Sequence, residues 1–172
     1  KKIYAAKGRP SDNPLIVHIA HIEDADKYCI TNDVYYKLAE KFLPGALTVI
    51  MPKRDCIPHE VTGGLETVAI RLPSDKNARA LIDAAGIPVA APSANRSGKP
   101  SPTTAKHVLE DMDGRIDMII DGGECSIGLE STIVSIGENC LTILRPGGVT
   151  AEMLGEICPV IIDKVVTEKL AA

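Results

Sequence analysis

The stretch Pro88-Val89-Ala90-Ala91-Pro92-Ser93-Ala94-Asn95-Arg96-Ser97-Gly98 indicates the fold class of this chain. Its first four residues have the small, apolar side chains of a buried strand, and an irregular stretch follows as far as Pro100. Open α/β sheets bind ligands at the carboxyl ends of their strands. Ser93 and Asn95 place a hydroxyl and an amide at such an end, and the small strand residues let a ligand approach the backbone. The stretch therefore predicts a ligand site at the end of a sheet strand.

Further strands and helices alternate on both sides of this stretch. Short apolar runs predict strands at Leu15–Ile19, Ala46–Met51, Thr67–Leu72, Pro88–Ala91, Ile116–Ile120, Ser131–Ile136, Leu141–Leu144 and Val160–Ile162. Helical spacing and end signals predict helices over 1–7 (closed by Gly8), over Asp33–Phe42, from an N-cap at Ser74 through Ala85, after an N-cap at Ser101, and from Thr150 to about Ile157. Gly137-Glu138-Asn139 favours a hairpin. The class is α/β or α+β, with an open mixed sheet and helices packed on it.

Length and composition are those of one globular domain, residues 1–172. Hydrophobic residues make up 45% of the chain and charged residues 24%. One Phe, four Tyr and no Trp argue against single-stranded nucleic acid bound by aromatic stacking. A net charge of −4 argues against a large phosphate-backbone binder, although a local basic pocket is compatible with it. No apolar run approaches the roughly 20 residues that span a bilayer, so no membrane contact is expected.

The cysteine pattern and the chain ends set further expectations. The five cysteines include no C-x-x-C pair, which disfavours a disulfide framework or a structural zinc site. Together with the lack of a secretory signal, this predicts a cytoplasmic protein. The chain opens on Lys1 without an initiator Met, and we expect it to be part of something longer.

Several common catalytic signatures are missing. A phosphate-binding loop is disfavoured because Ser93 replaces its first glycine and Pro100 its magnesium-binding hydroxyl. Gly63 stands where a zinc-protease helix would carry its second histidine. His18 and His21 would point to opposite faces of a strand, which disfavours joint metal binding, and no metal site is predicted. No G-x-S-x-G elbow supports an activated serine.

The connection Lys7-Gly8-Arg9-Pro10-Ser11-Asp12-Asn13-Pro14 is a candidate phosphate clamp. Its two prolines stiffen the backbone, and Lys7 and Arg9 project from it two residues apart. A rigid loop of this kind can hold phosphate oxygens in a fixed geometry. A solvated turn, whose charges contact only water, is an equally good interpretation of the loop taken alone.

Single polar residues on apolar strands are the other candidates. Arg71 within Val68–Leu72 needs an anionic partner, either a structural carboxylate or a substrate carboxylate. A lone histidine such as His18 is more often a hydrogen-bonded core residue than a ligand contact. Ser101 lies where a helix N-terminus would favour an anion, or where it simply caps that helix. Polar residues also border strands at Ser131-Thr132 and at Arg145-Pro146-Gly147-Gly148. The glycines of the second segment permit a tight turn or the close approach of a ligand.

Taken in order, these segments resemble the YrdC-like threonylcarbamoyl-adenylate synthases over nearly the whole chain. The resemblance is carried by Lys7-Gly8-Arg9-Pro10, Asn13-Pro14-Leu15, Pro44-Gly45-Ala46-Leu47-Thr48, Val68-Ala69-Ile70-Arg71-Leu72-Pro73, Pro92-Ser93-Ala94-Asn95, Ser131-Thr132-Ile133-Val134 and Leu144-Arg145-Pro146-Gly147. Each piece is weak alone, but the K-x-R and S-x-N pair together with the strand motifs is specific. The resemblance implies a twisted open α/β sheet of the YrdC/RibB type with a concave, basic pocket.

The resemblance also implies a reaction and a set of site residues. L-Threonine, bicarbonate and ATP would give L-threonylcarbamoyl-adenylate and pyrophosphate, with Mg²⁺ as cofactor, for the modification of tRNA at adenosine 37. The nucleotide would be held by Lys7, Arg9, Asn13, Thr67, Ser93, Asn95, Ser101 and Arg145, of which Lys7, Arg9, Ser93 and Asn95 are the expected catalytic residues. Threonine would be held by His18, Arg71, the backbone of Ala91, and Ser131. Partners would be tRNA-modification proteins and, weakly, RNA.

Two departures and two alternatives accompany this resemblance. Family members begin with a strand and a P-T-E-T-Y-G-L-like loop, so we expect the chain to be N-terminally incomplete, and nothing after Leu170 represents the small C-terminal domain of longer members.

A carbamoyl-adenylate-forming domain of hydrogenase maturation shares the K-x-R and S-x-N elements but normally adjoins paired C-x-x-C motifs. An RNA-binding module without chemistry is disfavoured by low aromatic content and net acidity.

Overall fold

The fold is built on one mixed β-sheet with open edges. The computed structural model describes residues 1–126 and 128–171, and in them seven strands form a sheet in the order β4-β1-β3-β2-β5-β6-β7. The strands are β1 (Ile16–His18), β2 (Leu47–Pro52), β3 (Thr67–Arg71), β4 (Val89–Ala91), β5 (Thr132–Ile136), β6 (Leu141–Arg145) and β7 (Val160–Ile162). The pairs β1–β3, β2–β5 and β6–β7 are parallel, and β1–β4, β2–β3 and β5–β6 are antiparallel. The predicted α/β class with an open mixed sheet is confirmed.

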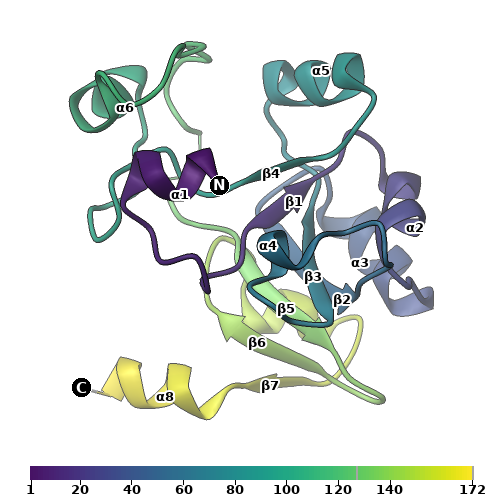
Figure 1. Cartoon of the computed structure of the whole chain (residues 1–172). Helices are drawn as coiled ribbons and strands as arrows, with labels where there is room; N and C mark the ends of the chain where they lie inside the picture. The colour runs from purple at the N-terminus through teal and green to yellow at the C-terminus, as the bar shows by residue number, and fades with distance from the viewer. Residues whose placement is uncertain (127, 172) are drawn as a thin grey trace.

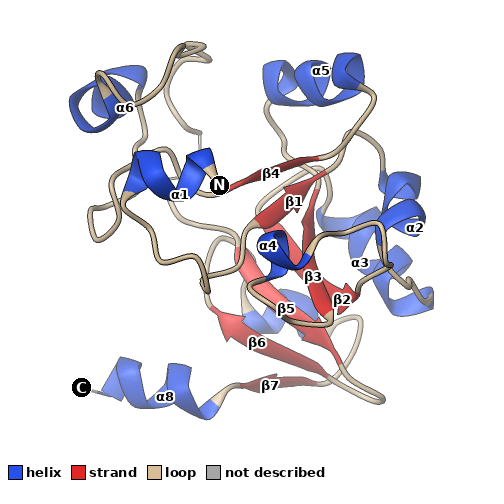
Figure 2. Ribbon diagram, viewed as in Figure 1, coloured by secondary structure: helices blue, strands red, loops and turns tan. Residues whose placement is uncertain are grey.

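Helices lie on both sides of this sheet (Figures 1 and 2). They are α1 (Lys2–Lys7), the 3₁₀ turn η1 (Ile22–Asp24), α2 (Ala25–Tyr28), α3 (Asp33–Phe42), α4 (His59–Thr62), α5 (Lys76–Ala85), α6 (Ala105–Met112), α7 (Ala151–Gly155) and α8 (Lys164–Ala171). In Figure 1, α2 and α3 lie to the right of the sheet, whereas α1 and α6 lie at the upper left. No helix among the described residues has the length and apolarity needed to cross a bilayer.

Local end signals correctly predicted several helix boundaries. Gly8 closes α1 in the left-handed region at φ 63°, a conformation that costs glycine little. The Thr150 hydroxyl accepts from the backbone N–H of Met153 at 3.3 Å and so caps α7. The structure adds a cap that was not predicted, since the Asn32 side chain accepts from the N–H of Tyr35 at 3.0 Å at the start of α3.

Two predicted N-caps are wrong. Asp75, not Ser74, caps α5, because its carboxylate accepts from the N–H of Ala78 at 2.8 Å. Thr104, not Ser101, caps α6, where its hydroxyl accepts from the N–H of His107 at 3.3 Å. The helix starts a few residues later than predicted because the proline-rich segment before it stays irregular.

The predicted strand over 116–120 is also wrong, since this run has no regular secondary structure. A strand needs a neighbour to pair with its backbone N–H and C=O groups, and no described strand pairs with these residues. Met118 and Ile120 are 76% and 61% exposed. Apolar composition alone therefore suggested a strand that the tertiary structure does not form.

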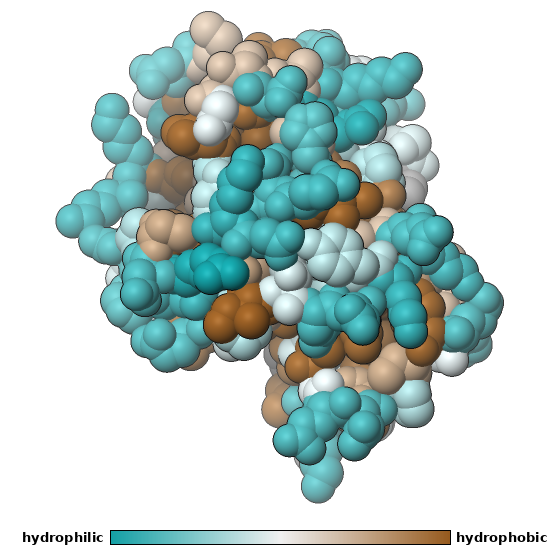
Figure 3. Space-filling view, turned by 90° about the vertical axis from the view of Figure 1, so that its right-hand side faces the viewer, coloured by the Kyte–Doolittle hydropathy of each residue, from teal (hydrophilic) through white to brown (hydrophobic). Residues whose placement is uncertain are grey.

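The two faces of the sheet differ sharply in character. Val17, Val49, Val68, Ile70 and Val134 point to one face, where they are buried in the core. Helix α3 covers this core with the buried side chains of Tyr35, Leu38, Ala39 and Phe42. The apolar stripe of the helix faces inward, and Figure 3, which views the right-hand side of Figure 1, shows a mostly hydrophilic exterior with hydrophobic patches between.

The opposite face of the central strands carries polar side chains, and we call it the polar face: His18, Thr48, Thr67, Arg71 and Arg145. Cα partners in adjacent strands point to the same face, and His18 pairs with Arg71. Ile50 pairs with Ala69, which places Thr48 and Thr67 on this face as well. All five except Thr48 are half-buried. This partly open face is where a polar ligand could contact the sheet.

Candidate functional site

Lys7 joins the N-terminal helix to the loop that follows β4. Its side chain is buried, with 5% of the residue exposed. The ammonium donates to the backbone carbonyl of Ser93 at 2.5 Å, to that of Asn95, and to Asn95 Oδ1 at 3.4 Å. The backbone N–H of Ser97 donates to the carbonyl of Lys7 at 2.9 Å. The K-x-R and S-x-N segments, which are far apart in the sequence, therefore meet in the structure.

Asn95 fixes the conformation of the same loop. It is also 5% exposed, and its amide group donates to the carbonyls of Arg96 and Lys99 at 3.0 and 2.7 Å. Burial lowers the pKa of Lys7, with the nearby charge of Arg9 as the second cause. Lys7 and Asn95 thus form a buried pair within the loop that follows β4. Ser93, whose carbonyl also accepts from Lys7, is exposed.

Arg9 and Asn13 lie together in the opening loop. Arg9 Nη2 donates to Asn13 Oδ1 at 2.7 Å and to the carbonyl of Pro14 at 2.9 Å. These contacts orient the guanidinium of Arg9. Hydrogen bonds within the loop therefore hold Arg9, and its role in a phosphate clamp with Lys7 stays a prediction.

Arg71 and Arg145 give the polar face its positive charge. Arg71 Nε donates to the carbonyl of Gly45 at 3.1 Å, and among the described residues no carboxylate lies within ion-pair distance of this guanidinium. Burial lowers the pKa of Arg71, and the charge of Arg145 lowers it further. A half-buried guanidinium whose terminal nitrogens have no acceptor in the described part of the chain is suited to an anion supplied from outside.

His18 lies beside Arg71 in the sheet. Its Nδ1 is 3.3 Å from the carbonyl of Val89, and its Cα partner in β3 is Arg71. Burial lowers the pKa of His18 to about 4 from the ordinary 6.5, with the charge of Arg71 as a second cause. At neutral pH, His18 is therefore an uncharged imidazole that can exchange hydrogen bonds with a polar ligand.

The shifted pKa of His18 predicts a pH dependence of stability. Between about pH 6.5 and pH 4 the unfolded chain binds a proton at this imidazole that the folded chain does not. Stability therefore falls as pH drops through this window, by up to about 3 kcal/mol. We expect His18→Gln to lose correspondingly less stability than the parent between pH 7 and pH 4, measured by urea unfolding. The matched control is His59→Gln at an exposed imidazole, and parallel curves for parent and His18→Gln would contradict the prediction.

A hydrogen-bonded chain links Arg145 to the core of the polar face. Arg145 Nε and Nη2 donate to the carbonyl of Ser131 at 3.1 and 2.7 Å, and Nη2 also lies 3.0 Å from Ser131 Oγ. Ser131 Oγ in turn is 2.8 Å from the buried hydroxyl of Thr48. Ser131 and Arg145, predicted for different ligands, therefore lie in direct contact.

Glu130 extends this chain to Ser101. Its two carboxylate oxygens are each 3.0 Å from a partner, Oε1 from Ser101 Oγ and Oε2 from Arg145 Nη1. Sequence reasoning missed both Glu130 and Thr48. Thr48 ends the motif Pro44–Thr48, which was noted without a role, and Glu130 directly precedes Ser131, but neither position carries a spacing signal for contact.

Ala91 and Thr67 lie at the margins of this arrangement. Among the strands that the structure describes, β4 is at the edge and pairs only with β1, so one side of its backbone has no strand partner there. Ala91 pairs with Ile16 and lies in the same strand as Val89, whose carbonyl is the hydrogen-bond partner of His18. Thr67 begins β3, four residues before Arg71 on the same face. Both positions are compatible with contact to a ligand lying across the sheet.

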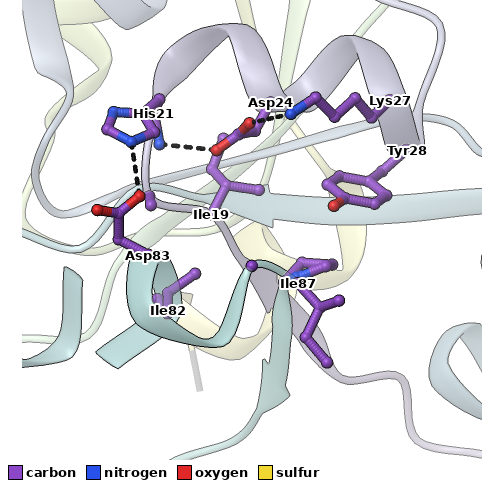
Figure 4. A pocket seen from close by; sticks show the side chains of 11 residues that line it. Ile19, His21, Asp24, Lys27, Tyr28, Ile82, Asp83 and Ile87 are labelled. Carbon is purple, nitrogen blue, oxygen red and sulfur yellow. Dashed lines mark hydrogen bonds and ion pairs between the residues drawn. The ribbon is translucent and has the colours of Figure 1, made fainter. Parts of the chain in front are cut away.

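Two cavities lie near the surface, one of them bordering this arrangement at Ser101. One, of about 280 Å³, is lined by the segment from Lys99 to Thr103 and by α6, and it includes Ser101. The other, of about 170 Å³, lies between η1, α2 and α5, where His21 Nε2 is 3.0 Å from Asp83 Oδ1 (Figure 4). His18 and His21 thus have different partners, and no group of three metal-binding side chains occurs among the described residues.

Comparison with known proteins places this geometry in a family. Residues 1–147 match the family model Sua5/yciO/yrdC, which is described as "Telomere recombination". The chain is 54% identical over 169 residues to a Bacillus subtilis (strain 168) protein named threonylcarbamoyl-AMP synthase, covering 95% of this chain and 48% of the relative. A protein of the same name from Pyrococcus abyssi is 49% identical, covering 91% of this chain and 48% of its own length. The chain thus spans about half the length of these curated relatives.

Solved structures agree with this assignment. A double variant of P. abyssi Sua5 superposes with a TM-score of 0.93 at 46% identity, covering 96% of this chain and 49% of that one. P. abyssi Sua5 complexed with L-threonine gives a TM-score of 0.88 at the same identity, with 93% and 48% coverage. Full-length HypF in its phosphate- and nucleotide-bound form, at 19% identity and a TM-score of 0.69, shares the fold alone. The chain belongs to the Sua5/YciO/YrdC family.

Proposed function

We propose that this chain forms L-threonylcarbamoyl-adenylate and pyrophosphate from L-threonine, bicarbonate and ATP. The observation that carries the proposal is Arg71, a half-buried guanidinium without a carboxylate partner among the described residues, next to a neutral His18 on the polar face. The names of the Bacillus and Pyrococcus relatives and the threonine complex of P. abyssi Sua5 support it. The product would serve the threonylcarbamoylation of tRNA adenosine 37, in the cytoplasm, through other tRNA-modification proteins and with weak RNA contact.

In the threonine subsite, Arg71 would bind the substrate carboxylate through its terminal nitrogens. A carboxylate accepts two parallel hydrogen bonds from a guanidinium, which fixes both position and orientation. Neutral His18 and Ser131 would contact the polar groups of threonine, and the unpaired side of β4 would offer the backbone of Ala91. The substrate carboxylate would supply the negative charge that Arg71 does not find in a described carboxylate. This subsite would therefore select an amino acid over an amine.

In the nucleotide subsite, the cations of the opening loop and the end of β6 would hold the triphosphate. Arg9 and Arg145 would offset phosphate charge, Ser93 would donate a hydroxyl hydrogen bond, and Asn13, Thr67 and Ser101 would complete the subsite. Lys7 and Asn95 hold the loop on which Ser93 lies. Lys7 would add positive charge near the triphosphate, and Lys7 and Asn95 together would keep the loop in the conformation that presents Ser93.

The chemistry needs no protein nucleophile. The threonine amine would attack the carbon of carbon dioxide, supplied from bicarbonate, and lose a proton to give a carbamate. A carbamate oxygen would then attack the α-phosphorus as the bond to the β,γ-phosphates breaks and pyrophosphate leaves. This chain's residues would position the two reactants and stabilise charge on the phosphates, as in other phosphoryl-group chemistry.

Mg²⁺ would accompany ATP. The described residues gather no set of three metal-binding side chains, a composition that fits an ion held chiefly by phosphate oxygens and water rather than by a protein cage. When bound, it would neutralise part of the negative charge of the triphosphate.

The decisive test is pyrophosphate release by the full-length protein. We expect release from ATP that depends on both threonine and bicarbonate. Release that needs carbamoyl phosphate instead of threonine would favour carbamoyl-adenylate formation, the chemistry of hydrogenase maturation. RNA binding without any nucleotide turnover would favour a non-catalytic RNA-binding module. Either outcome would overturn the proposal.

A further inference from the structure

Glu130 is held in place by its side chain and by its backbone. The carboxylate bonds to Ser101 Oγ on one side and to Arg145 Nη1 on the other, each at 3.0 Å. The backbone carbonyl of Glu130 accepts from the N–H of Gly148 at 3.0 Å. A Cβ at Gly147 would lie only 2.2 Å from that carbonyl oxygen, so only glycine permits the close approach. The carboxylate therefore starts from a fixed main-chain position.

The contacts of Glu130 complete the orientation of Arg145. The other two nitrogens of that guanidinium, Nε and Nη2, bond to Ser131. With Nη1 on Glu130, all three nitrogens have partners, and the plane of the guanidinium is set. Arg71, a guanidinium on the same face, donates among the described residues only to the carbonyl of Gly45, so the two arginines differ in how far the protein constrains them.

The same carboxylate orients Ser101. This serine does not cap α6, since Thr104 does, so its hydroxyl is available for another contact. It lies in an irregular, proline-rich segment, where local structure alone does not fix a side chain. The bond to Glu130 ties this segment to the strands that carry Ser131 and Arg145.

Building on the proposed function, we propose that Glu130 is a positioning residue of the nucleotide subsite, which orients Arg145 for the triphosphate and anchors the segment that carries Ser101 beside it. Its contact with Arg145 is partly exposed, with 47% of the Glu130 side chain and 34% of the Arg145 side chain accessible. Ion pairs at such exposure contribute little to stability. The contribution of Glu130 is therefore to binding geometry more than to folding, and it acts on ATP rather than on threonine.

The test compares Glu130→Ala with Glu130→Gln in the full-length protein. Alanine removes both contacts, whereas glutamine keeps an acceptor for Arg145 and can donate its amide to Ser101 Oγ without carrying charge. We expect Glu130→Ala to raise the KM for ATP about tenfold or more, with kcat and the KM for threonine within about threefold. Glutamine should keep the KM for ATP within about threefold of the parent. Glu138→Ala, at an exposed turn position, is the matched control.

Each outcome decides the matter. An unchanged KM for ATP in Glu130→Ala overturns the proposal. An equal rise of the KM for ATP in Glu130→Ala and Glu130→Gln that excess Mg²⁺ reverses also overturns it, because Glu130 would then be a metal ligand. If the alanine variant does not fold, Glu130→Met, of similar volume, replaces it. If the parent protein releases no pyrophosphate, the proposed function fails on its own. Calorimetric binding of a non-hydrolysable ATP analogue to parent and variants then tests the positioning role separately.

Discussion

Replacing Arg71 with alanine should abolish most threonine-dependent pyrophosphate release. The terminal nitrogens of this guanidinium have no carboxylate partner among the described residues, and the neighbouring Arg145 adds repulsion that a bound anion would relieve. A carboxylate held by two charge-assisted hydrogen bonds of roughly 1.5–3 kcal/mol each would lose about 100-fold or more in affinity. We therefore expect the KM for threonine to rise by at least that factor, measured by initial rates at saturating ATP.

The controls for this prediction separate charge from geometry. Arg71→Lys keeps the charge but loses the paired hydrogen bonds, and should fall between alanine and the parent. Arg54→Ala removes an exposed guanidinium whose Nε donates to the carbonyl of Asp26, away from the polar face, and should leave the KM for threonine unchanged. A folded Arg71→Ala protein with the parent's KM for threonine would remove Arg71 from the site.

Replacing Lys7 with alanine is expected to have the second largest effect. The variant leaves the carbonyls of Ser93 and Asn95, together with Asn95 Oδ1, without their shared donor. Losing one charge-assisted contact costs about 1.5–3 kcal/mol, which corresponds to roughly 10- to 150-fold in rate or affinity. We expect adenylate formation to fall by this factor while the protein stays folded, because the sheet and its core do not depend on the loop.

A neighbouring lysine and the second cation of the loop provide the comparisons. Lys2→Ala removes an exposed ammonium from the same helix and should retain the parent's rate. Arg9→Ala should lose most adenylate formation while staying folded. A folded Lys7→Ala/Arg9→Ala double variant with nearly the parent's turnover would contradict the role of the opening loop. Circular dichroism and thermal melting establish that each variant is folded.

The site was only partly predictable from the sequence, because local rules describe single segments and not the contacts between them. The pattern around Arg71 predicted a cation that needs an anionic partner, which stays a prediction, and the backbone contact with Gly45 could not be foreseen. Ser101 was predicted as a possible cap, but the cap is Thr104 and the serine contacts Glu130 instead. The run over 116–120 has strand-like composition, and only the lack of a pairing neighbour keeps it irregular.

The sequence by itself determined the α/β class, the end of α1 at Gly8 and the β5–β6 hairpin. These features follow from side-chain spacing, turn residues and backbone stereochemistry, which act over a few residues. The tertiary structure alone decided the strand order, the register that pairs His18 with Arg71, and the bridge from Ser101 through Glu130 to Arg145. Such contacts join distant segments, and burial of one apolar sheet face against α3 is what brings the polar groups of the other face together.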